Sequence, residues 1–167
     1  MTASVFPQVN QEGFPLSFKS LLEWECQRAV RYQESFALAV VAIDPTSKEG
    51  EPREGDIELE IVKENVKKEI RKTDLQDQDG ETLNILLLHV DRPETLQIAE
   101  RVRSRIQHYS FPGKTPNARV NRTVSIGAAC YPLHSVDSTD LRKRALEALH
   151  RAQADGGNKV VVFKNHG

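Results

Sequence analysis

The stretch FALAVVAI at residues 36–43 decides the fold of this chain. All of its residues are apolar, and Asp44-Pro45 ends it. The stretch is far too short to cross a bilayer, and a continuous apolar run of this length is typical of a strand with both faces buried. Such a strand needs cover on both sides, so the stretch predicts a sheet with helices packed against it.

Helical periodicity surrounds this strand in the sequence. Apolar residues recur at spacings of three and four, which is the pattern of a helix with one face in the core. Four segments show it: residues 17–32, residues 57–72, a segment that begins at Pro93, and residues 139–155. Asp91 and Glu94 have the spacing of a capping box before the third segment, and Gly156-Gly157 supplies a stop after the fourth.

Other segments predict the remaining strands. Asp79-Gly80 is a turn signal between DLQDQ at 74–78 and TLNILLLHV at 82–90, so these two segments predict a hairpin. A third long strand is expected at 119–131, and NKVVVF at 158–163 closes the chain as a strand. The order of elements predicts one α/β (α+β) sandwich with a central mixed five-stranded sheet flanked by helices.

Composition excludes several classes of protein. The 167 residues carry 23 Lys and Arg against 24 Asp and Glu, a net charge of −1, which excludes nucleic-acid binding through bulk charge. Cys26 and Cys130 are the only cysteines, so neither a disulfide framework nor a cysteine-rich zinc site is expected. The histidines show no ligand spacing either, and we expect no metal site.

The amino-terminal segment has the composition of a loose connection. It contains proline, glycine and polar amides, and it lacks the basic start and apolar centre of a signal peptide. We therefore expect residues 1–13 to be a flexible leader or linker remnant, residues 14–167 to form one domain, and the protein to be cytoplasmic without membrane insertion.

Several strings, in order along the chain, resemble the GGDEF domain. They are RAVRYQESFALAVVAID at 28–44, Gly55-Asp56, Ala99-Glu100-Arg101, TVSIGAACYP at 123–132, and ALEALHRAQADGGNKV at 145–160. GGDEF domains are the catalytic domains of diguanylate cyclases, which make cyclic di-GMP from two GTP molecules. The resemblance implies the nucleotidyl-cyclase-like α/β sandwich of that family.

The signature that names the family is degenerate in this chain. The resemblance aligns it with GETLN, that is Gly80, Glu81, Thr82, Leu83 and Asn84. Thr82 then stands where the family has a carboxylate that holds a divalent metal. Ala42 stands at the second metal carboxylate, although a slip of two residues in the alignment would put Asp44 there instead.

The phosphate-binding cations of the family are replaced as well. Gln153 and Gly157 occupy the positions of the Lys and Arg that contact the triphosphate, whereas Asp56 matches a guanine-facing carboxylate. Phosphoryl-type transfer depends on metal ions and cations that neutralise charge on the phosphates. We therefore expect no cyclase activity and no bound cofactor.

One feature of the family is present in full, the R-x-x-D pattern of an inhibitory product site. Arg71 and Asp74 have this spacing, and five residues separate Asp74 from Gly80, as in the family. Arg101 matches a further arginine of that site. An arginine fork can bind guanine O6 and N7 or phosphate oxygens, and a carboxylate can accept from guanine N–H groups. The resemblance thus implies cyclic di-GMP as a ligand of Arg71, Asp74 and Arg101.

Plainer interpretations of both motifs stay open. Residues three apart at a helix end often form an ordinary ion pair, and Asp79-Gly80 is also what a tight hairpin turn requires. Two functions compete. The first is a catalytically inactive cyclic di-GMP receptor, coupled to an unknown effector protein or an adjacent domain and compatible with a homodimer. The second is a nucleotide-independent dimerisation or protein-docking module in bacterial signalling. An active cyclase with displaced groups and a GTP-binding regulator fit the missing cations less well.

Overall fold

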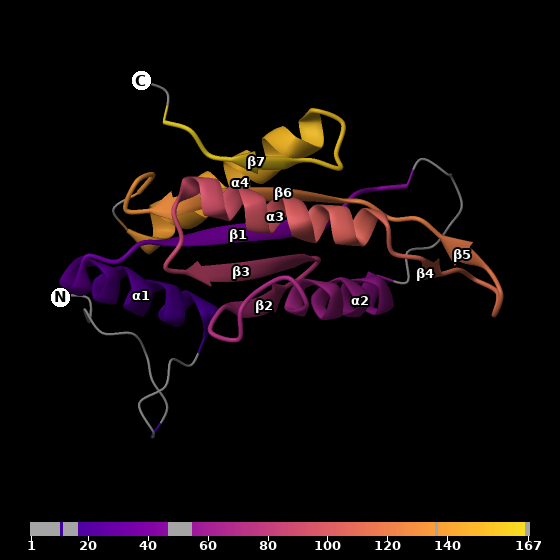
Figure 1. Ribbon diagram of the computed structural model, residues 1–167, viewed down its shortest axis with the longest axis horizontal. Helices are drawn as coiled ribbons and strands as arrows, with labels where there is room; N and C mark the ends of the chain where they lie inside the picture. Colours follow the sequence, from indigo (N-terminus) through magenta and orange to yellow (C-terminus); the bar gives the residue numbers. More distant parts are fainter. Residues whose placement is uncertain (1–10, 12–16, 47–54, 136, 166–167) are drawn as a thin grey trace.

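The computed structural model describes residues 11, 17–46, 55–135 and 137–165 (Figure 1). Four helices and a five-stranded sheet make up most of this part of the chain. The helices are α1 (Phe18–Tyr32), α2 (Gly55–Lys67), α3 (Arg92–Gln107) and α4 (Ser138–Ala154). The strands of the sheet are β1 (Phe36–Ile43), β2 (Leu75–Asp79), β3 (Thr82–Leu88), β6 (Val124–Tyr131) and β7 (Val160–Val162). The leader expected at 1–13 lies outside the described residues apart from Gln11.

The sheet has the order β2-β3-β1-β6-β7, with β1 in the middle. β1 runs antiparallel to both β3 and β6, and β7 runs parallel to β6, so the sheet is mixed. The predicted α/β sandwich with a mixed five-stranded sheet is therefore confirmed. None of the described helices is long and apolar enough to span a membrane.

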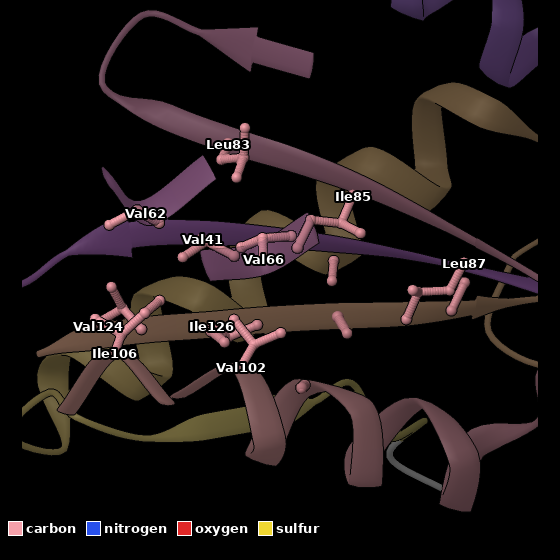
Figure 2. Packing of buried hydrophobic residues seen from close by; sticks show 14 of the residues in the cluster. Val41, Val62, Val66, Leu83, Ile85, Leu87, Val102, Ile106, Val124 and Ile126 are labelled. Carbon is pink, nitrogen blue, oxygen red and sulfur yellow. The ribbon is translucent and has the colours of Figure 1, made fainter. Parts of the chain in front are cut away.

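Both faces of β1 are covered, as the apolar stretch predicts. Alternate residues of the strand enter two separate apolar clusters. On one face Val41 packs with α2 and α3, and Figure 2 shows Val66, Val102 and Ile106 close to the same side of the sheet. On the other face the strand packs against α1 and α4, for example against Cys26.

The ends of several elements differ from the predictions. α2 ends at Lys67 rather than at 72, since residues 68–70 form a turn. Ile70 nevertheless packs against the core, and this contact explains why the apolar periodicity continues past the helix end. The predicted strand at 119–131 is divided, because β5 (Arg119–Val120) pairs with β4 (Phe111–Pro112) in a separate two-stranded sheet and β6 begins only at Val124.

Gly127 lets α4 lie directly on β6. A Cβ atom at Gly127 would come within 2.0 Å of the Leu149 backbone nitrogen and 2.4 Å of the Ala145 carbonyl oxygen. These neighbours are backbone atoms of a packed helix, so they cannot yield as a flexible side chain would. The glycine therefore sets the distance between the helix and the sheet.

We predict that Gly127→Ala lowers the free energy of unfolding by about 3 kcal/mol, because the helix must move away from the sheet. Gly80→Ala is the matched control. Gly80 has a φ of +59° but open space around its Cβ position, so only backbone strain of about 1 kcal/mol is expected. Urea denaturation of both variants measures the difference. Equal losses in the two variants would contradict the role given to Gly127.

Candidate functional site

Asp74 lies in the turn between α2 and β2, and its carboxylate organises that turn. The side chain is fully buried. Its Oδ2 accepts a hydrogen bond from the Arg71 backbone N–H at 2.9 Å, and its Oδ1 accepts from the Leu88 backbone N–H at 3.0 Å. One carboxylate thus ties the turn after α2 to the end of β3.

Arg71 lies against the same carboxylate, so the structure brings these two predicted residues together. Its Nε is 3.5 Å from Asp74 Oδ2, and its Nη2 donates to the carbonyl oxygen of Leu88. The side chain is 52% exposed, although its partner is buried. The guanidinium is therefore held on one edge and open to solvent elsewhere, an arrangement that suits recognition of an anion or a guanine edge.

Arg101 is joined to the same turn by a different residue, Glu69. Its Nε is 3.2 Å from Glu69 Oε2, and its Nη2 donates to the Glu69 carbonyl oxygen at 3.0 Å. Among the described residues, no hydrogen bond or ion pair joins Arg101 directly to Arg71 or Asp74. The three predicted residues therefore surround one turn, but the third reaches it only through Glu69.

Glu69 is the residue of this region that the sequence analysis missed. Its second carboxylate oxygen accepts from Arg105 Nε at 2.6 Å, so one carboxylate holds two arginines. These hydrogen bonds, the one from Arg105 first and that from Arg101 after it, lower the pKa of Glu69 below its ordinary value against the opposing effect of burial. Nothing in the local sequence marks Glu69, because its partners lie on α3.

A groove of about 780 Å³ runs along α3 beside this contact. Its walls carry three arginines, Arg101, Arg103 and Arg105, and Glu69 together with other polar and aromatic side chains, whereas Arg71 and Asp74 do not line it. The lining residues that matter below are Glu69, Glu100, Arg101, Ser104, Arg105 and His108. The groove is thus a cationic surface that begins where Arg101 meets the turn.

Arg103 lines the same groove, but its partners differ from those of Arg101 and Arg105. Its guanidinium bonds to Glu100 at 2.8 Å, and its Nη1 bonds to Gln107 and to Asn158, both at 2.9 Å. Its charge is therefore neutralised locally and directed toward the loop before β7.

The segment that the resemblance aligns with the family signature, residues 80–84, lies in the turn between β2 and β3 and in the first residues of β3. Gly80 takes a positive φ of 59° in the turn. Thr82 pairs with Asp79 across the hairpin and with Ala42 of β1, and its hydroxyl donates to the Asp79 carbonyl oxygen at 2.9 Å. The two positions that the family resemblance assigns to metal carboxylates are thus neighbours in the sheet, and here they carry a methyl and a hydroxyl group.

Asp44, the alternative candidate for a metal ligand, already has three donors. Its carboxylate accepts from Thr123 Oγ1 at 2.7 Å, from Ser125 Oγ at 2.6 Å and from the Asn158 backbone N–H at 2.7 Å. Among the described residues, no group of three or more His, Cys, Asp or Glu side chains is arranged to hold a metal ion. A hard divalent cation prefers several carboxylate oxygens, and the residues Ala42, Thr82 and Asp44 do not fit one.

The loop after α4 is closed around the same carboxylate. Gly157 has a φ of +72°, and a Cβ atom there would lie 2.9 Å from the Asp44 carboxyl carbon. A side chain at this position would collide with Asp44, so the glycine permits the contact. The side chain of Asp56, the predicted guanine-facing carboxylate, lies outside the described residues.

Comparison with known proteins identifies the family. The family model described as "Diguanylate cyclase, GGDEF domain" matches residues 16–159. The chain belongs to the GGDEF family. A curated relative, diguanylate cyclase A of Treponema denticola, is 30% identical over 115 residues, which cover 67% of this chain and 30% of that protein. This GGDEF domain thus spans less than a third of the length of that relative.

Solved GGDEF structures share the fold. The GGDEF domain of YfiN (TpbB) from Pseudomonas aeruginosa superposes with a TM-score of 0.80 at 20% identity, covering 89% of this chain and 94% of that one. The GGDEF domain of DgcB from Caulobacter crescentus, solved in complex with c-di-GMP, superposes with a TM-score of 0.77 at 18% identity and covers 97% of both chains. At these identities the likeness establishes the fold alone.

The hydrogen bonds of the buried Asp74 carboxylate should contribute to the stability of this GGDEF domain. Asp74→Asn leaves one of the two backbone N–H groups that bond to this buried side chain facing an amide N–H₂, so we expect a loss of about 2–3 kcal/mol in the free energy of unfolding. Asp77→Asn, the same chemical change on exposed β2, should cost less than about 0.5 kcal/mol. Chemical denaturation compares the two, and a small effect at both positions would contradict the structural role of Asp74.

Proposed function

We propose that this GGDEF domain is a catalytically inactive, cytoplasmic receptor for cyclic di-GMP. The observation that carries the proposal is the pair of arginines around one turn, with Arg71 half exposed beside a buried carboxylate and Arg101 tied to the same turn by Glu69. Cyclic di-GMP offers two phosphates and two guanines, and arginine forks recognise both groups. A related GGDEF domain, that of DgcB, has been solved with this ligand bound.

The roles of the three residues differ in this proposal. Arg71 and Arg101 contact the ligand, since their side chains are 52% and 55% exposed. Asp74 orients Arg71 and fixes the turn. For a guanine to bond directly to the Asp74 carboxylate, Arg71 or the end of β3 must first move, because the side chain has no exposed surface.

The proposed loss of catalysis rests on charge. Ala42 and Thr82 offer no carboxylate to a metal, and Gln153 and Gly157 offer no cation to a triphosphate. Asp44 adds a negative charge beside Gly157, where an arginine would be needed to bind phosphate. With no means of neutralising the phosphates, the transition state of cyclisation is not stabilised.

A receptor also needs an output, and we infer that this one acts through an effector protein, a second copy of the domain or an adjacent domain. The curated relatives that the chain matches are more than three times as long as the part it covers. Ligand binding influences such a partner only if the two states of the domain differ in their affinity for it.

The first test is a calorimetric titration with cyclic di-GMP. We expect the unmodified domain to bind at micromolar affinity or tighter, and Arg71→Ala to weaken binding at least about tenfold, since a charge-assisted contact to a phosphate or guanine is lost. Arg31→Ala is the matched control. Arg31 lies on α1, which covers the opposite face of the sheet, and its loss should leave the affinity unchanged.

Two results would contradict the receptor proposal. One is the absence of both binding heat and thermal stabilisation at ligand concentrations far above the micromolar range, because a ligand of the folded state must raise its stability. The other is an equal loss of affinity for cyclic di-GMP in Arg71→Ala and Arg31→Ala, which would show that the effect comes from the overall charge of the domain.

The catalytic part of the proposal has a separate test. Incubated with GTP and Mg²⁺ or Mn²⁺, the purified domain should form no cyclic di-GMP, whereas an authentic diguanylate cyclase in the same assay does. Chromatography of the nucleotides measures the product. Metal-dependent product from this domain would contradict the proposed inactivity while leaving the binding experiment unaffected.

A specific observation favours the second candidate, a protein-docking module. A groove of about 430 Å³ on α2 is lined by Ile57, Ile61 and Tyr109 beside charged residues, and Ile57 is 51% exposed. Exposed apolar side chains in a groove are typical of contact surfaces. Under this alternative the domain binds no nucleotide, so the same titration separates the two functions.

A further inference from the structure

Arg105 belongs to the same anion-binding surface as Arg101, although the family pattern does not single it out. The two residues are four positions apart and therefore share one face of α3. Both point their Nε groups at Glu69, at 3.2 Å and 2.6 Å. An internal carboxylate thus occupies the space between two arginines.

Arg101 and Arg105 have guanidinium N–H donors beyond those that bond to Glu69. Among the described residues, Nη1 of Arg101 and both terminal nitrogens of Arg105 make no further hydrogen bond. The two side chains are 55% and 38% exposed and line the groove along α3, whereas Glu69 is only 16% exposed. The structure therefore holds two guanidinium groups at one place with donors facing an open groove.

We propose that Arg101 and Arg105 form a phosphate subsite of the cyclic di-GMP site, and that Glu69 occupies this subsite as an internal anion until a phosphate group replaces its carboxylate. The identity of the ligand rests on the proposed function. The subsite itself is defined by the chemistry of a phosphate or phosphodiester group.

The charges of the two anions favour replacement of the Glu69 carboxylate by a phosphate group over binding of the phosphate beside it. A carboxylate and a phosphate use the same donors of an arginine, and two anions in contact repel each other. The Glu69 carboxylate is joined to the two arginines by side-chain hydrogen bonds, so it can rotate away while the backbone of the turn after α2 stays in place. Arg101 stays in place meanwhile, because its Nη2 is also bonded to the Glu69 carbonyl oxygen at 3.0 Å.

The test uses Glu69→Gln, which removes the charge and keeps the size of the side chain. The matched control is Glu100→Gln, the same change on the same groove, at a residue bonded to Arg103 instead. The probes are inorganic pyrophosphate and cyclic di-GMP, each followed by NMR titration at low ionic strength, with thermal unfolding to show that both variants are folded.

If Glu69 fills the subsite about nine-tenths of the time, its removal should strengthen pyrophosphate binding about tenfold. Glu100→Gln should change it less than about twofold, and adding Arg105→Ala to Glu69→Gln should abolish the gain. Unchanged or weaker pyrophosphate binding in Glu69→Gln would overturn the proposal, as would an equal gain in Glu100→Gln.

The two probes keep this proposal separate from the receptor function. A pyrophosphate gain in Glu69→Gln without any cyclic di-GMP binding, in the unmodified domain or in the variant, would support the blocked subsite and refute cyclic di-GMP as its ligand. Cyclic di-GMP binding that depends on Arg71 but is not strengthened by Glu69→Gln would support the receptor and refute the blockade.

Discussion

The middle strand of the sheet must be covered on both faces, and the positions of the four helices follow from this constraint. From Phe36 to Val41 no residue of β1 is more than 2% exposed. Two helices pack on each face, and on one of these faces Gly127 allows α4 to approach the sheet backbone directly. Removal of this apolar surface from water is the main favourable term in folding such a domain.

Two carboxylates then attach the loops to this layered core. Asp44, just beyond β1, accepts three hydrogen bonds and closes the loop after α4. Asp74 joins the turn after α2 to the end of β3. The carboxylate of Asp44 thus holds the backbone of the loop after α4, while the buried carboxylate of Asp74 leaves Arg71 half exposed to solvent.

Local patterns in the sequence predicted most of the fold, because apolar periodicity and cap residues act over a few positions. The capping box of Asp91 and Glu94 is confirmed, as is β1 at both ends. The end of α2 was predicted too late, since Ile70 keeps a helical spacing while packing from a turn. Glu69 could not be found in this way: its partners are 32 and 36 residues away, and which arginine of α3 faces it depends on the rotation of a packed helix.

The most direct test of the account is to locate the ligand on the domain. Two-dimensional NMR of the ¹⁵N-labelled domain, titrated with cyclic di-GMP, reports the response of each backbone amide. If cyclic di-GMP binds at this turn, the shifts concentrate in residues 69–74, at Leu88 and along α3 from Arg101 to Arg105. No shifts at saturating ligand, or shifts concentrated instead around Asp44, Thr82 and Gly157, would contradict binding at this turn.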